Sequence, residues 1–403
     1  MSKLVRCTLG DIGKVKMCKR VLKEQTSESG DIPFYKISTF GGEASCFISR
    51  ELFDTYKKEY SYPKKGDILL SAAGTLGKKI VYNGEEAYFQ DSNIVWLEND
   101  ESQVLNKYLY YFYDVIKWKK TSGSTIDRLY NENILGAEIY YPDIATQKKI
   151  INTLGLLDAK IENNNQIISN IEIMAKTIYD YWFLQFEFPN EDGKPYKSSG
   201  GKMVWNDALK REIPEGWKAS PYAIFGNLLM GQSPKSDSYN NAGVGYPLIN
   251  GAAELQKDNV IISKYTSNPT RISGKGDLLF CIRATIGNLQ FGQTEYCLGR
   301  GVASYSPIDK RYAEYLYFVT NDILEHYNKI LTGSIIVGIT KDDLSEQAVL
   351  APSKERVFAF SKVTQPMFDK IYELKAENQK LTSLRDFLLP MFMNGQVTFK
   401  EEV

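Results

Sequence analysis

The sequence predicts an α+β protein in which two β-rich domains are separated and joined by two long helices that pair as an antiparallel coiled coil. Three observations lead to this prediction: a long internal repeat, the same order of expected elements in both copies, and a heptad pattern that closes each copy. With 403 residues, the chain has room for more than one hydrophobic core.

The internal repeat is clearest in two segments, KKGDILLSAAGTLGKK (64–79) and GKGDLLFCIRATIGNL (274–289). Four pairs of anchors keep an offset of 210 residues: Asp67 and Asp277, Gly77 and Gly287, the turns SGST (122–125) and TGSI (332–335), and Pro142 and Pro352. Between these anchors the offset drifts slightly, because the aromatic run that begins at Tyr108 aligns with the run at Tyr315, at an offset of 207. A repeat this long predicts two similar domains related by pseudo-twofold symmetry.

Each copy begins with short β-branched and aromatic runs broken by glycine, asparagine and proline, such as KKIVYNGEEAYFQDSNIVWL (78–97). These runs predict strands joined by tight turns, and glycine-rich loops at equivalent places in the two copies. One aromatic amphipathic helix is expected next, at 106–119 in the first copy and at 313–330 in the second. The predicted organisation is a first β-rich domain at 1–142, a long central helix at 143–185, a connector at 186–213, a second β-rich domain at 214–351 and a long C-terminal helix at 352–392.

The two long helices carry apolar residues at alternating spacings of four and three, which is the pattern of a coiled-coil seam. The first seam contains one polar interruption and consists of Ile150, Leu154, Leu157, Ile161, Asn164, Ile168, Ile171, Ala175, Ile178 and Trp182. The second also contains one asparagine and consists of Met367, Ile371, Leu374, Asn378, Leu381 and Leu388. Pro390 is expected to end the second helix.

The positions of the two asparagines predict how the helices pair. If Asn164 occupies a d position, Asn378 occupies an a position, and antiparallel coiled coils set a against d. We therefore expect Asn164 and Asn378 to bond each other and to fix the register. The same register brings Ile168 to Leu374 and Ile171 to Ile371.

Composition excludes several functional classes. Lysine plus arginine and aspartate plus glutamate both number 49, so a nucleic-acid interface would have to concentrate its positive charge locally. The five cysteines are scattered and there is one histidine, which argues against a metal centre. No apolar stretch is long enough to span a membrane and the first residues lack the apolar core of a signal peptide, so we expect a cytoplasmic protein without a membrane partner.

A search for catalytic motifs favours a non-catalytic chain. His326 is the only histidine available as a base, and it has no counterpart in the first copy, so a surface position is expected. The segment AGTLGKK (73–79) lacks the spacing of a phosphate-binding loop. Asp143, Asp158 and Lys160 match a loose nuclease pattern, but two of them fall inside the seam helix. The aromatic runs at 108–118 and 315–319 could stack on bases, although their helical spacing favours packing in the core.

The ordered set of motifs resembles the DNA-specificity subunit of type I restriction-modification enzymes. The carrying segments are LDAKIENNNQIISNIEIMAKTIYDYWF in the first long helix, IYELKAENQKLTSLRDFLLPMFMNGQV in the second, the connector FEFPNEDGKPYKSSGGKMVWNDALKREIPEGWK, and GQSPKSDSYN in the second domain. The resemblance covers essentially the whole chain. One departure is that the first domain lacks the PEGW lead-in that precedes the second.

The resemblance implies a specificity subunit that is not itself an enzyme. Its two target-recognition domains would read the two unlike halves of a split target in double-stranded DNA, and its helices would fix their spacing. It also implies two methyltransferase (modification) subunits that bind S-adenosylmethionine, and a restriction subunit that uses ATP and Mg²⁺, so no cofactor is expected on this chain. Two alternatives stay open: a specificity protein of a solitary or fused DNA methyltransferase, and a coiled-coil adaptor that does not bind DNA.

Candidate DNA contacts were chosen as cations and amides in the expected loops, since arginine, lysine and asparagine bind phosphates and base edges. Those of the first copy are Lys14, Lys16, Lys19, Arg20, Lys78 and Lys79. Those of the second are Lys235, Arg283, Asn288 and Arg300. No catalytic or metal-binding residue is predicted.

Overall fold

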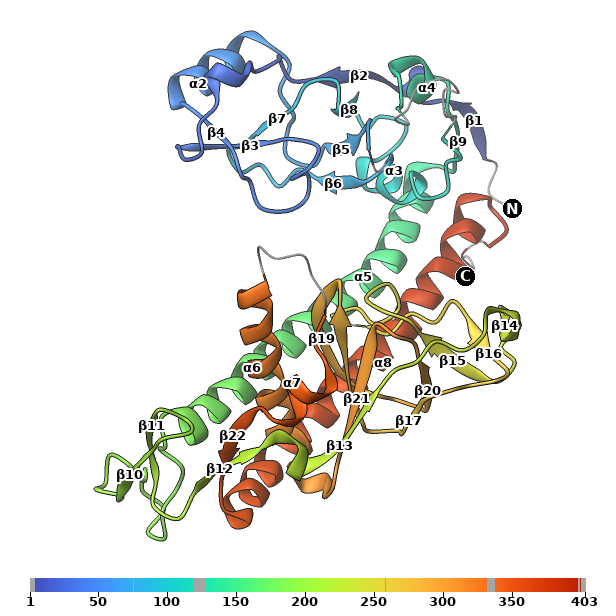
Figure 1. Cartoon of the computed structure of the whole chain (residues 1–403). Coiled ribbons are helices and arrows are strands. Elements are labelled where there is room, and N and C mark those ends of the chain that lie inside the picture. Colours follow the sequence, from blue (N-terminus) through green and yellow to red (C-terminus); the bar gives the residue numbers. More distant parts are fainter. Residues whose placement is uncertain are drawn as a thin grey trace. The chain divides into compact units, whose positions relative to one another are not determined.

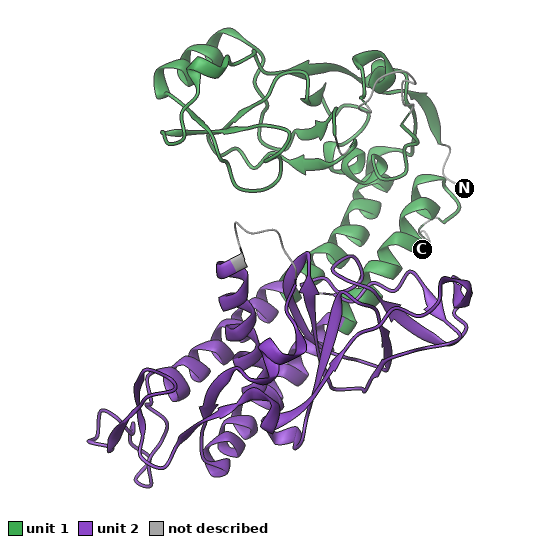
Figure 2. Cartoon of the chain, in the orientation of Figure 1, with its two compact units in different colours: residues 1–164, 376–403 green, residues 165–375 purple. Residues whose placement is uncertain are grey.

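The computed structural model describes residues 4–74, 76–118, 128–257, 259–331, 338–397 and 399. The chain forms two compact units, coloured separately in Figure 2: unit 1 contains residues 1–164 and 376–403, and unit 2 contains residues 165–375. Their boundary falls inside both long helices, so each unit holds one β-rich domain and one end of each helix. The turns expected at 122–125 and 332–335 lie outside the described residues.

The main sheet of unit 1 is antiparallel and has the strand order β2-β8-β5-β6 (Figure 1). These strands are β2 (Gly13–Met17), β8 (Ile94–Asn99), β5 (Ile68–Ser71) and β6 (Lys79–Val81). A smaller sheet contains β4 (Phe47–Ile48), β3 (Ile32–Tyr35) and β7 (Tyr88–Phe89), and its β3–β7 pair is parallel. The remaining elements are β1 (Val5–Thr8), which pairs with β9 (Glu138–Tyr141), and α1 (Leu9–Ile12), η1 (Lys23–Gln25), α2 (Arg50–Glu59), α3 (Asn106–Phe112) and α4 (Asn131–Leu135).

Unit 2 has a main antiparallel sheet of the same kind, with the order β13-β21-β18-β19. These strands are β13 (Gly226–Met230), β21 (Val302–Pro307), β18 (Leu278–Arg283) and β19 (Thr285–Phe291). Its second sheet contains β14 (Tyr239–Asn240), β16 (Tyr265–Thr266), β15 (Tyr246–Ile249), β20 (Tyr296–Leu298) and β17 (Ile272–Ser273), and its β15–β20 pair is parallel. The remaining elements of this domain are β12 (Lys218–Pro221), which pairs with β22 (Ala348–Ala351), and η3 (Tyr222–Phe225), η4 (Ser236–Ser238), η5 (Lys310–Tyr312), α6 (Ala313–Leu331) and α7 (Lys341–Ser345).

The internal repeat is confirmed at the level of strand register. Ile68 pairs with Val81 in unit 1, and Leu278 pairs with Phe291 in unit 2, so both partners keep the offset of 210 residues. The same ladders make Lys79 and Leu289 equivalent positions. Both main sheets therefore have the same strand order and the same register at their β5–β6 and β18–β19 edges.

The aromatic helices pack in the cores, as their spacing predicts. Tyr108 and Tyr315 are buried, and each hydroxyl donates a hydrogen bond to a backbone carbonyl, of Tyr140 and Leu350 respectively. Helix α3 is shorter than the helix expected at 106–119. It ends at Phe112, where a turn allows Asp114 to reach Lys79 and the Trp118 ring to pack on Tyr113.

The long helices are α5 (Ile144–Tyr179), followed by the π-helical turn η2 (Asp180–Leu184), and α8 (Lys354–Met393). In unit 1, Asn164 is fully buried and its amide donates hydrogen bonds to Asn378 Oδ1 at 2.9 Å and to Glu377 Oε2 at 2.7 Å. In unit 2, Ile168, Ile371 and Leu374 form a buried cluster against which Ile171 packs. These contacts confirm the antiparallel register.

The expectation that Pro390 ends the second long helix is wrong, because α8 continues to Met393. A proline lacks one N–H and crowds the preceding turn, but it does not prevent residues that follow it from being helical. The Pro390 carbonyl still accepts a hydrogen bond from the Asn394 N–H at 2.9 Å. The helix ends where Gly395 adopts a φ of +67°, the usual position for a left-handed glycine after a helix.

The connector is ordered in unit 2 and contains the hairpin β10 (Met203–Asn206) and β11 (Arg211–Pro214). Phe186, Phe188 and Trp217 anchor it in the core of that unit, and the Phe188 and Tyr196 rings stack with centroids 4.6 Å apart. Within the described part of the chain, no helix is long and apolar enough to cross a membrane.

Candidate nucleic-acid interface

The two segments that share the Gly-Asp-hydrophobic-Leu pattern form different loops. In unit 1, residues 72–78 connect β5 to β6, and Gly74 and Gly77 adopt φ values of +71° and +79°. In unit 2, β18 runs to Arg283 and β19 begins at Thr285, so Ala284 alone makes the turn. The expectation of equivalent glycine-rich loops is therefore wrong for the second copy, where the β-branched residues of CIRATIG extend both strands.

Each unit places an arginine beside this loop, but from opposite segments of the chain. In unit 1, Ala73 forms a bridge with Arg128, which arrives from the segment before α4. The equivalent positions in unit 2, 210 residues later, are Arg283 and Gly338. A Cβ atom added at Gly338 would lie 2.9 Å from Arg283 Cγ, so the arginine stem of unit 2 occupies the space over that glycine.

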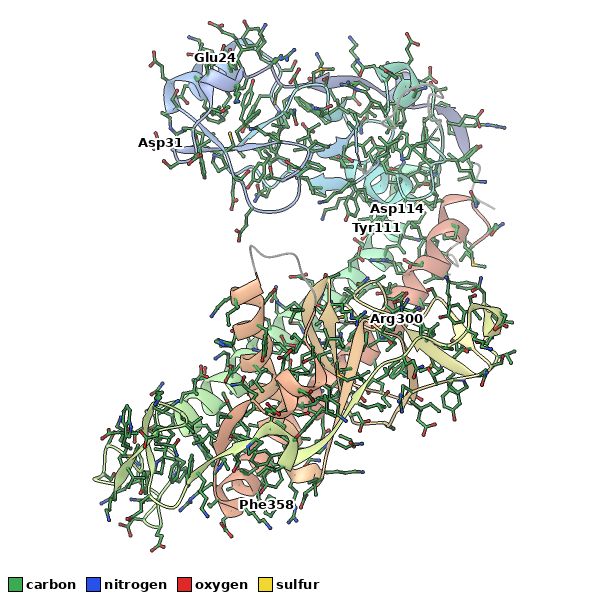
Figure 3. The ribbon with its side chains drawn as sticks, viewed as in Figure 1. Glu24, Asp31, Tyr111, Asp114, Arg300 and Phe358 are labelled. Carbon is green, nitrogen blue, oxygen red and sulfur yellow. The ribbon has the colours of Figure 1, made fainter. Side chains whose placement is uncertain are left out.

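Arg300 lies at the tip of the loop between β20 and β21 and is exposed (Figure 3). The loop backbone is fixed from below: the Gly299 N–H donates to the Ile249 carbonyl at 2.7 Å and the Gly301 N–H donates to the Asn250 carbonyl at 3.1 Å. Added Cβ atoms at Gly299 and Gly301 would lie 2.2 and 2.4 Å from Asn250 atoms. The guanidinium is thus carried by a backbone that has little room to move.

The same tip in unit 1 carries no arginine of its own. The β2–β8 and β13–β21 ladders place Ser92, which has a φ of +48°, at the position of Arg300. Arg128 donates to Ser92 Oγ at 2.8 Å and to the Ser92 carbonyl at 3.3 Å. Arg128 was missed by sequence reasoning, although the 210-residue offset pairs it with Gly338 and pairs Ala73 with Arg283.

The remaining cations of the first copy have mixed surroundings. Lys16 forms an ion pair with Glu98 at 3.5 Å, and the Lys19 ammonium lies 4.8 Å from the Tyr60 ring centroid. Lys78 donates to the Phe40 carbonyl. Lys14 and Arg20 are exposed and form no hydrogen bond or ion pair with any residue that the structure describes.

Lys79 is not placed to contact DNA, contrary to the sequence prediction. Its side chain is 8% exposed, forms an ion pair with Asp114 at 2.5 Å, and donates to the Tyr110 carbonyl. Burial lowers the pKa of Lys79, while the Asp114 carboxylate opposes that shift. An ammonium held in this way would have to break three contacts, including the one with the Tyr110 ring, to reach a phosphate.

Asn288 is also used internally. It adopts a φ of +52° at an irregularity of β19, and its amide donates to the Leu255 carbonyl at 2.7 Å. In unit 2, the exposed cations without a hydrogen bond or ion pair to other described residues therefore include Lys235, Arg283 and Arg300 of the predicted set. Lys235 lies directly before η4 and uses only its carbonyl, which accepts from Ser238.

The residues weighed for catalysis have structural surroundings. Asp143 accepts hydrogen bonds from the Thr146 N–H and hydroxyl at 2.9 Å, which caps the start of α5 and lowers the pKa of its carboxyl group. Asp158 accepts from Tyr111 Oη at 2.6 Å and from Arg385 at 3.0 Å. His326 is exposed. Within the described ranges, no cluster of three or more potential metal ligands occurs.

Comparison with known proteins agrees with this organisation. The profile of the type I restriction modification DNA specificity domain matches residues 1–173 and again 214–381. A putative type I restriction enzyme specificity subunit of Haemophilus influenzae is 56% identical over 154 residues, which cover 38% of this chain and 40% of that protein. The MjaIX specificity subunit of Methanocaldococcus jannaschii is 24% identical over 401 residues, covering 92% of this chain and 88% of that protein.

A solved structure shares the fold over nearly the whole length. The S subunit of a type I restriction-modification system from M. genitalium superposes with a TM-score of 0.60 at 16% identity, covering 97% of this chain and 96% of that one. The two family matches correspond to the two copies of the repeat, and together they span most of the sequence. The chain therefore belongs to the family of type I restriction-modification DNA specificity proteins.

Proposed function

We propose that this chain is the sequence-specific DNA-binding subunit of a type I restriction-modification complex, and that each β-rich domain reads one half of a bipartite, asymmetric target. The observation that carries the proposal is the pair of arginines beside equivalent sheet edges, Arg128 in unit 1 and Arg283 in unit 2. Arginine is the side chain best suited to guanine edges and to phosphates. Because the two arginines come from opposite segments and have different neighbours, the two half-sites should differ.

The strongest contacts are expected in unit 2, where Arg283 and Arg300 are exposed and Lys235 lies on the chain that follows β13. In unit 1, Arg128 is held by Ser92, and Lys14 and Arg20 supply exposed positive charge. The overall charge is neutral, so these local groups would have to supply the electrostatic part of binding.

Partner subunits would bind the long helices. Both units expose apolar side chains on them: Leu156 is 72% exposed and Phe387 60% in unit 1, and Ile173 is 62% exposed in unit 2. Isolated exposed apolar residues are ordinary, but several on paired helices suit a protein interface. We assign these surfaces to two modification subunits that bind S-adenosylmethionine and methylate adenine, and to a restriction subunit that uses ATP and Mg²⁺. A solitary or fused methyltransferase as the partner is the second candidate.

Methylation mapping tests this function. Genomes from cells with and without the gene are compared, and the expected result is one modified motif with two specified halves that disappears without the gene. Arg283→Ala and Arg300→Ala should each change or weaken the second half-site, whereas Arg128→Ala should affect the first. Uniform weakening at both halves would indicate phosphate contacts in place of base contacts.

Lys310→Ala provides the matched control, because Lys310 is an exposed cation of unit 2 that follows the other end of β21. Its motif should be unchanged. Salt-dependent binding of purified chain and methyltransferase subunit to duplex DNA separates a DNA reader from a coiled-coil adaptor. Absence of both the modified motif and DNA binding would contradict the proposal.

A further inference from the structure

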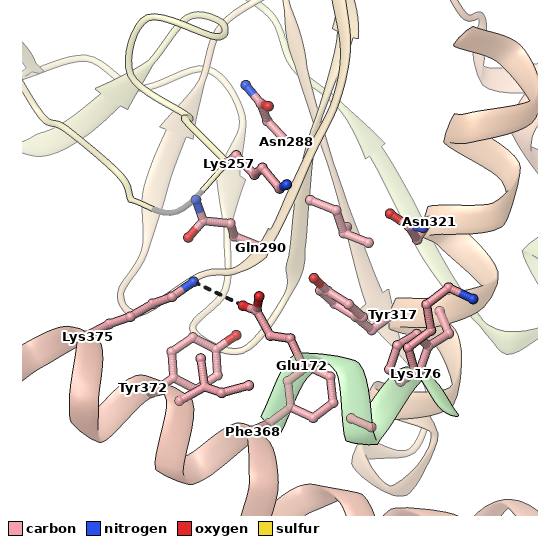
Figure 4. A pocket seen from close by; sticks show the side chains of 14 residues that line it. Glu172, Lys176, Lys257, Asn288, Gln290, Tyr317, Asn321, Phe368, Tyr372 and Lys375 are labelled. Carbon is pink, nitrogen blue, oxygen red and sulfur yellow. Dashed lines mark ion pairs between the residues drawn. The ribbon is translucent and has the colours of Figure 1, made fainter. Parts of the chain in front are cut away.

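Unit 2 contains a cavity of about 350 Å³ bounded by β19, α6, and parts of α5 and α8 (Figure 4). Its volume falls in the range of ligand-binding pockets, which is roughly 300–1,000 Å³. All of its lining residues belong to unit 2, and none is among the exposed arginines assigned to DNA. The cavity therefore needs its own explanation.

One wall of the cavity is aromatic and aliphatic. The rings of Tyr317 and Phe368 lie 5.1 Å apart at 69°, and Phe318 contributes a third ring 6.0 Å from Phe368. Leu289 and Ile371, both buried, extend this apolar surface. Such a surface suits a flat ring, because aromatic pairs stabilise each other beyond the area that they bury.

The polar part of the lining is predominantly basic, with three lysines and one glutamate. Lys176 is bound by Asp180 at 2.7 Å, and Lys375 lies 3.7 Å from Glu172. Lys257 is exposed and makes no hydrogen bond or ion pair with other residues that the structure describes. In Figure 4, Lys257 lies on the side opposite α8, so a bound molecule could contact the aromatic wall and this ammonium together.

The equivalent place in unit 1 is filled by the chain itself. Lys79, equivalent to Leu289, lies there with its ammonium on Asp114 and on the Tyr110 carbonyl. Arg385, which is 210 residues after Ala175, reaches Asp158 at 3.0 Å. These long side chains occupy in unit 1 the region that short or apolar residues leave open in unit 2.

The substitutions between the two places act together. Asp114 and Asp158 of unit 1 correspond to Asn321 and Phe368 of unit 2, and the hydrogen bond between Tyr111 and Asp158 is replaced by the Phe318–Phe368 ring contact. Two acidic groups that hold cations in unit 1 are thus absent from the unit 2 cavity. Its charge balance favours an anion over a cation.

We propose that this cavity binds a small planar aromatic anion, with its ring against Tyr317 and Phe368 and its anionic group at Lys257. A ligand that combines a heteroaromatic ring with a phosphate has this chemistry. The site is separate from the DNA-reading loops, so it goes beyond the proposed function and does not depend on it.

Titration calorimetry of the full chain with adenosine 5′-monophosphate tests the proposal, with adenosine and inorganic phosphate as probes that carry only one of the two features. The monophosphate should bind once per chain, and each partial probe at least about ten-fold more weakly. Equal affinity for adenosine would overturn the anionic part of the proposal, and equal affinity for phosphate the aromatic part. No binding of the monophosphate at millimolar concentration would overturn the whole.

Two variants locate the site. Leu289→Lys with Asn321→Asp transplants the ion pair of unit 1 into the cavity and should abolish binding; unchanged affinity in the folded variant would overturn the proposal. Lys257→Glu alters only an exposed side chain and decides the matter if the double variant does not fold, since it should weaken binding about ten-fold or more. Lys275→Ala, another exposed lysine of unit 2, is the matched control. Loss of binding on Arg283→Ala with no effect of Lys257→Glu would place the ligand at the DNA interface and contradict the assignment.

Discussion

The outer edges of the two main sheets, β6 in unit 1 and β19 in unit 2, occupy the same place in the repeat but have different chemistry. In unit 1, Lys79 is buried against Asp114 and a second pair joins Asp158 to Arg385. In unit 2, the equivalent surface is apolar and opens into a cavity. The difference shows that the strand order and register can be kept while a whole set of polar side chains is exchanged, because the ladder depends on backbone hydrogen bonds and on the buried face.

A second difference lies at the strand that precedes the recognition loops. The residue after β2 is Cys18, which is buried and whose pKa is raised by burial to about 12. The residue after β13 is Gly231, where an added Cβ would lie 2.1 Å from the Gly299 carbonyl oxygen and 2.6 Å from that of Val302. Unit 2 therefore packs three backbone segments where unit 1 packs a side chain.

The largest expected effect comes from removing this difference. Gly231→Ala forces backbone atoms apart in unit 2 and should lower its free energy of unfolding by about 3 kcal/mol. Cys18→Ala at the equivalent place in unit 1 only removes a buried sulfur atom and should cost about 1 kcal/mol. Calorimetric unfolding, with hydrogen exchange of the β13 and β21 amides, measures both. Wild-type unfolding of Gly231→Ala would show that the loops rearrange easily.

The ionic edge of unit 1 can be converted toward that of unit 2. Asp114→Asn leaves the buried Lys79 ammonium without its carboxylate and should cost about 1–2 kcal/mol, a value reduced by the half-exposed position of Asp114. Lys79→Leu combined with Asp114→Asn copies unit 2 and should return the free energy of unfolding to within about 1 kcal/mol of wild type. Denaturant unfolding of the three proteins measures this cycle, and additive losses in the double variant would contradict it.

The helix seam allows a comparison of equivalent layers. The Asn164–Asn378 layer of unit 1 corresponds, after 210 residues, to the Ile168–Leu374 layer of unit 2. Replacing Asn164 by Leu and Asn378 by Ile should raise the free energy of unfolding by about 1 kcal/mol, because a polar layer is exchanged for an apolar one.

Asn164→Leu alone should give no gain, because Asn378 and Glu377 would each lose the donated hydrogen bond. Thermal unfolding of the single and double variants makes the comparison. A single variant as stable as the double one would contradict a role for the asparagine pair in register.

The smallest effect is a pH dependence confined to unit 2. Burial raises the pKa of Glu314, while the hydrogen bond from Ser361 at 2.7 Å opposes the shift. A carboxyl group whose pKa is higher in the folded than in the unfolded chain favours folding when protonated, so stability should fall as pH rises from about 4.5 through the folded pKa.

Glu314→Gln should remove this fall, which we expect to be below about 1 kcal/mol. The equivalent residue of unit 1 is the exposed Lys107, and Lys107→Gln should leave the pH profile unchanged. Unfolding curves collected between pH 4 and pH 7, roughly the range in which a raised carboxyl pKa falls, provide the measurement. An identical slope for Glu314→Gln and wild type would contradict the prediction.

Most of the fold could be predicted because it depends on local periodicity. The alternating spacing of the seams predicts the long helices, and the asparagine phases predict their antiparallel pairing, since both follow from residue spacing along one helix. The length of α3 could not be predicted, because its end depends on the contact of Asp114 with Lys79, which is distant in sequence. The end of α8 depends on Gly395, whereas Pro390 constrains only the turn before it.

The candidate interface was predicted less well, because spacing does not say whether a cation is exposed. Arg283 and Arg300 are exposed, as a DNA contact requires, whereas Lys79 and Asn288 bind backbone carbonyls inside their own unit. Arg128 was overlooked because its partner, Ala73, lies 55 residues earlier in the chain. Its equivalence to Arg283 becomes visible only when the bridge and the repeat are considered together.

The sequence by itself therefore determined the duplication, the order of elements and the register of the helix pair, because each is encoded in the spacing of residue types along the chain. Tertiary structure alone decided which charges are buried and which are free, and which half of the repeat is filled or open. Those properties depend on side chains brought together from distant segments, such as Lys79 with Asp114, or Arg283 over Gly338, and on the burial that follows.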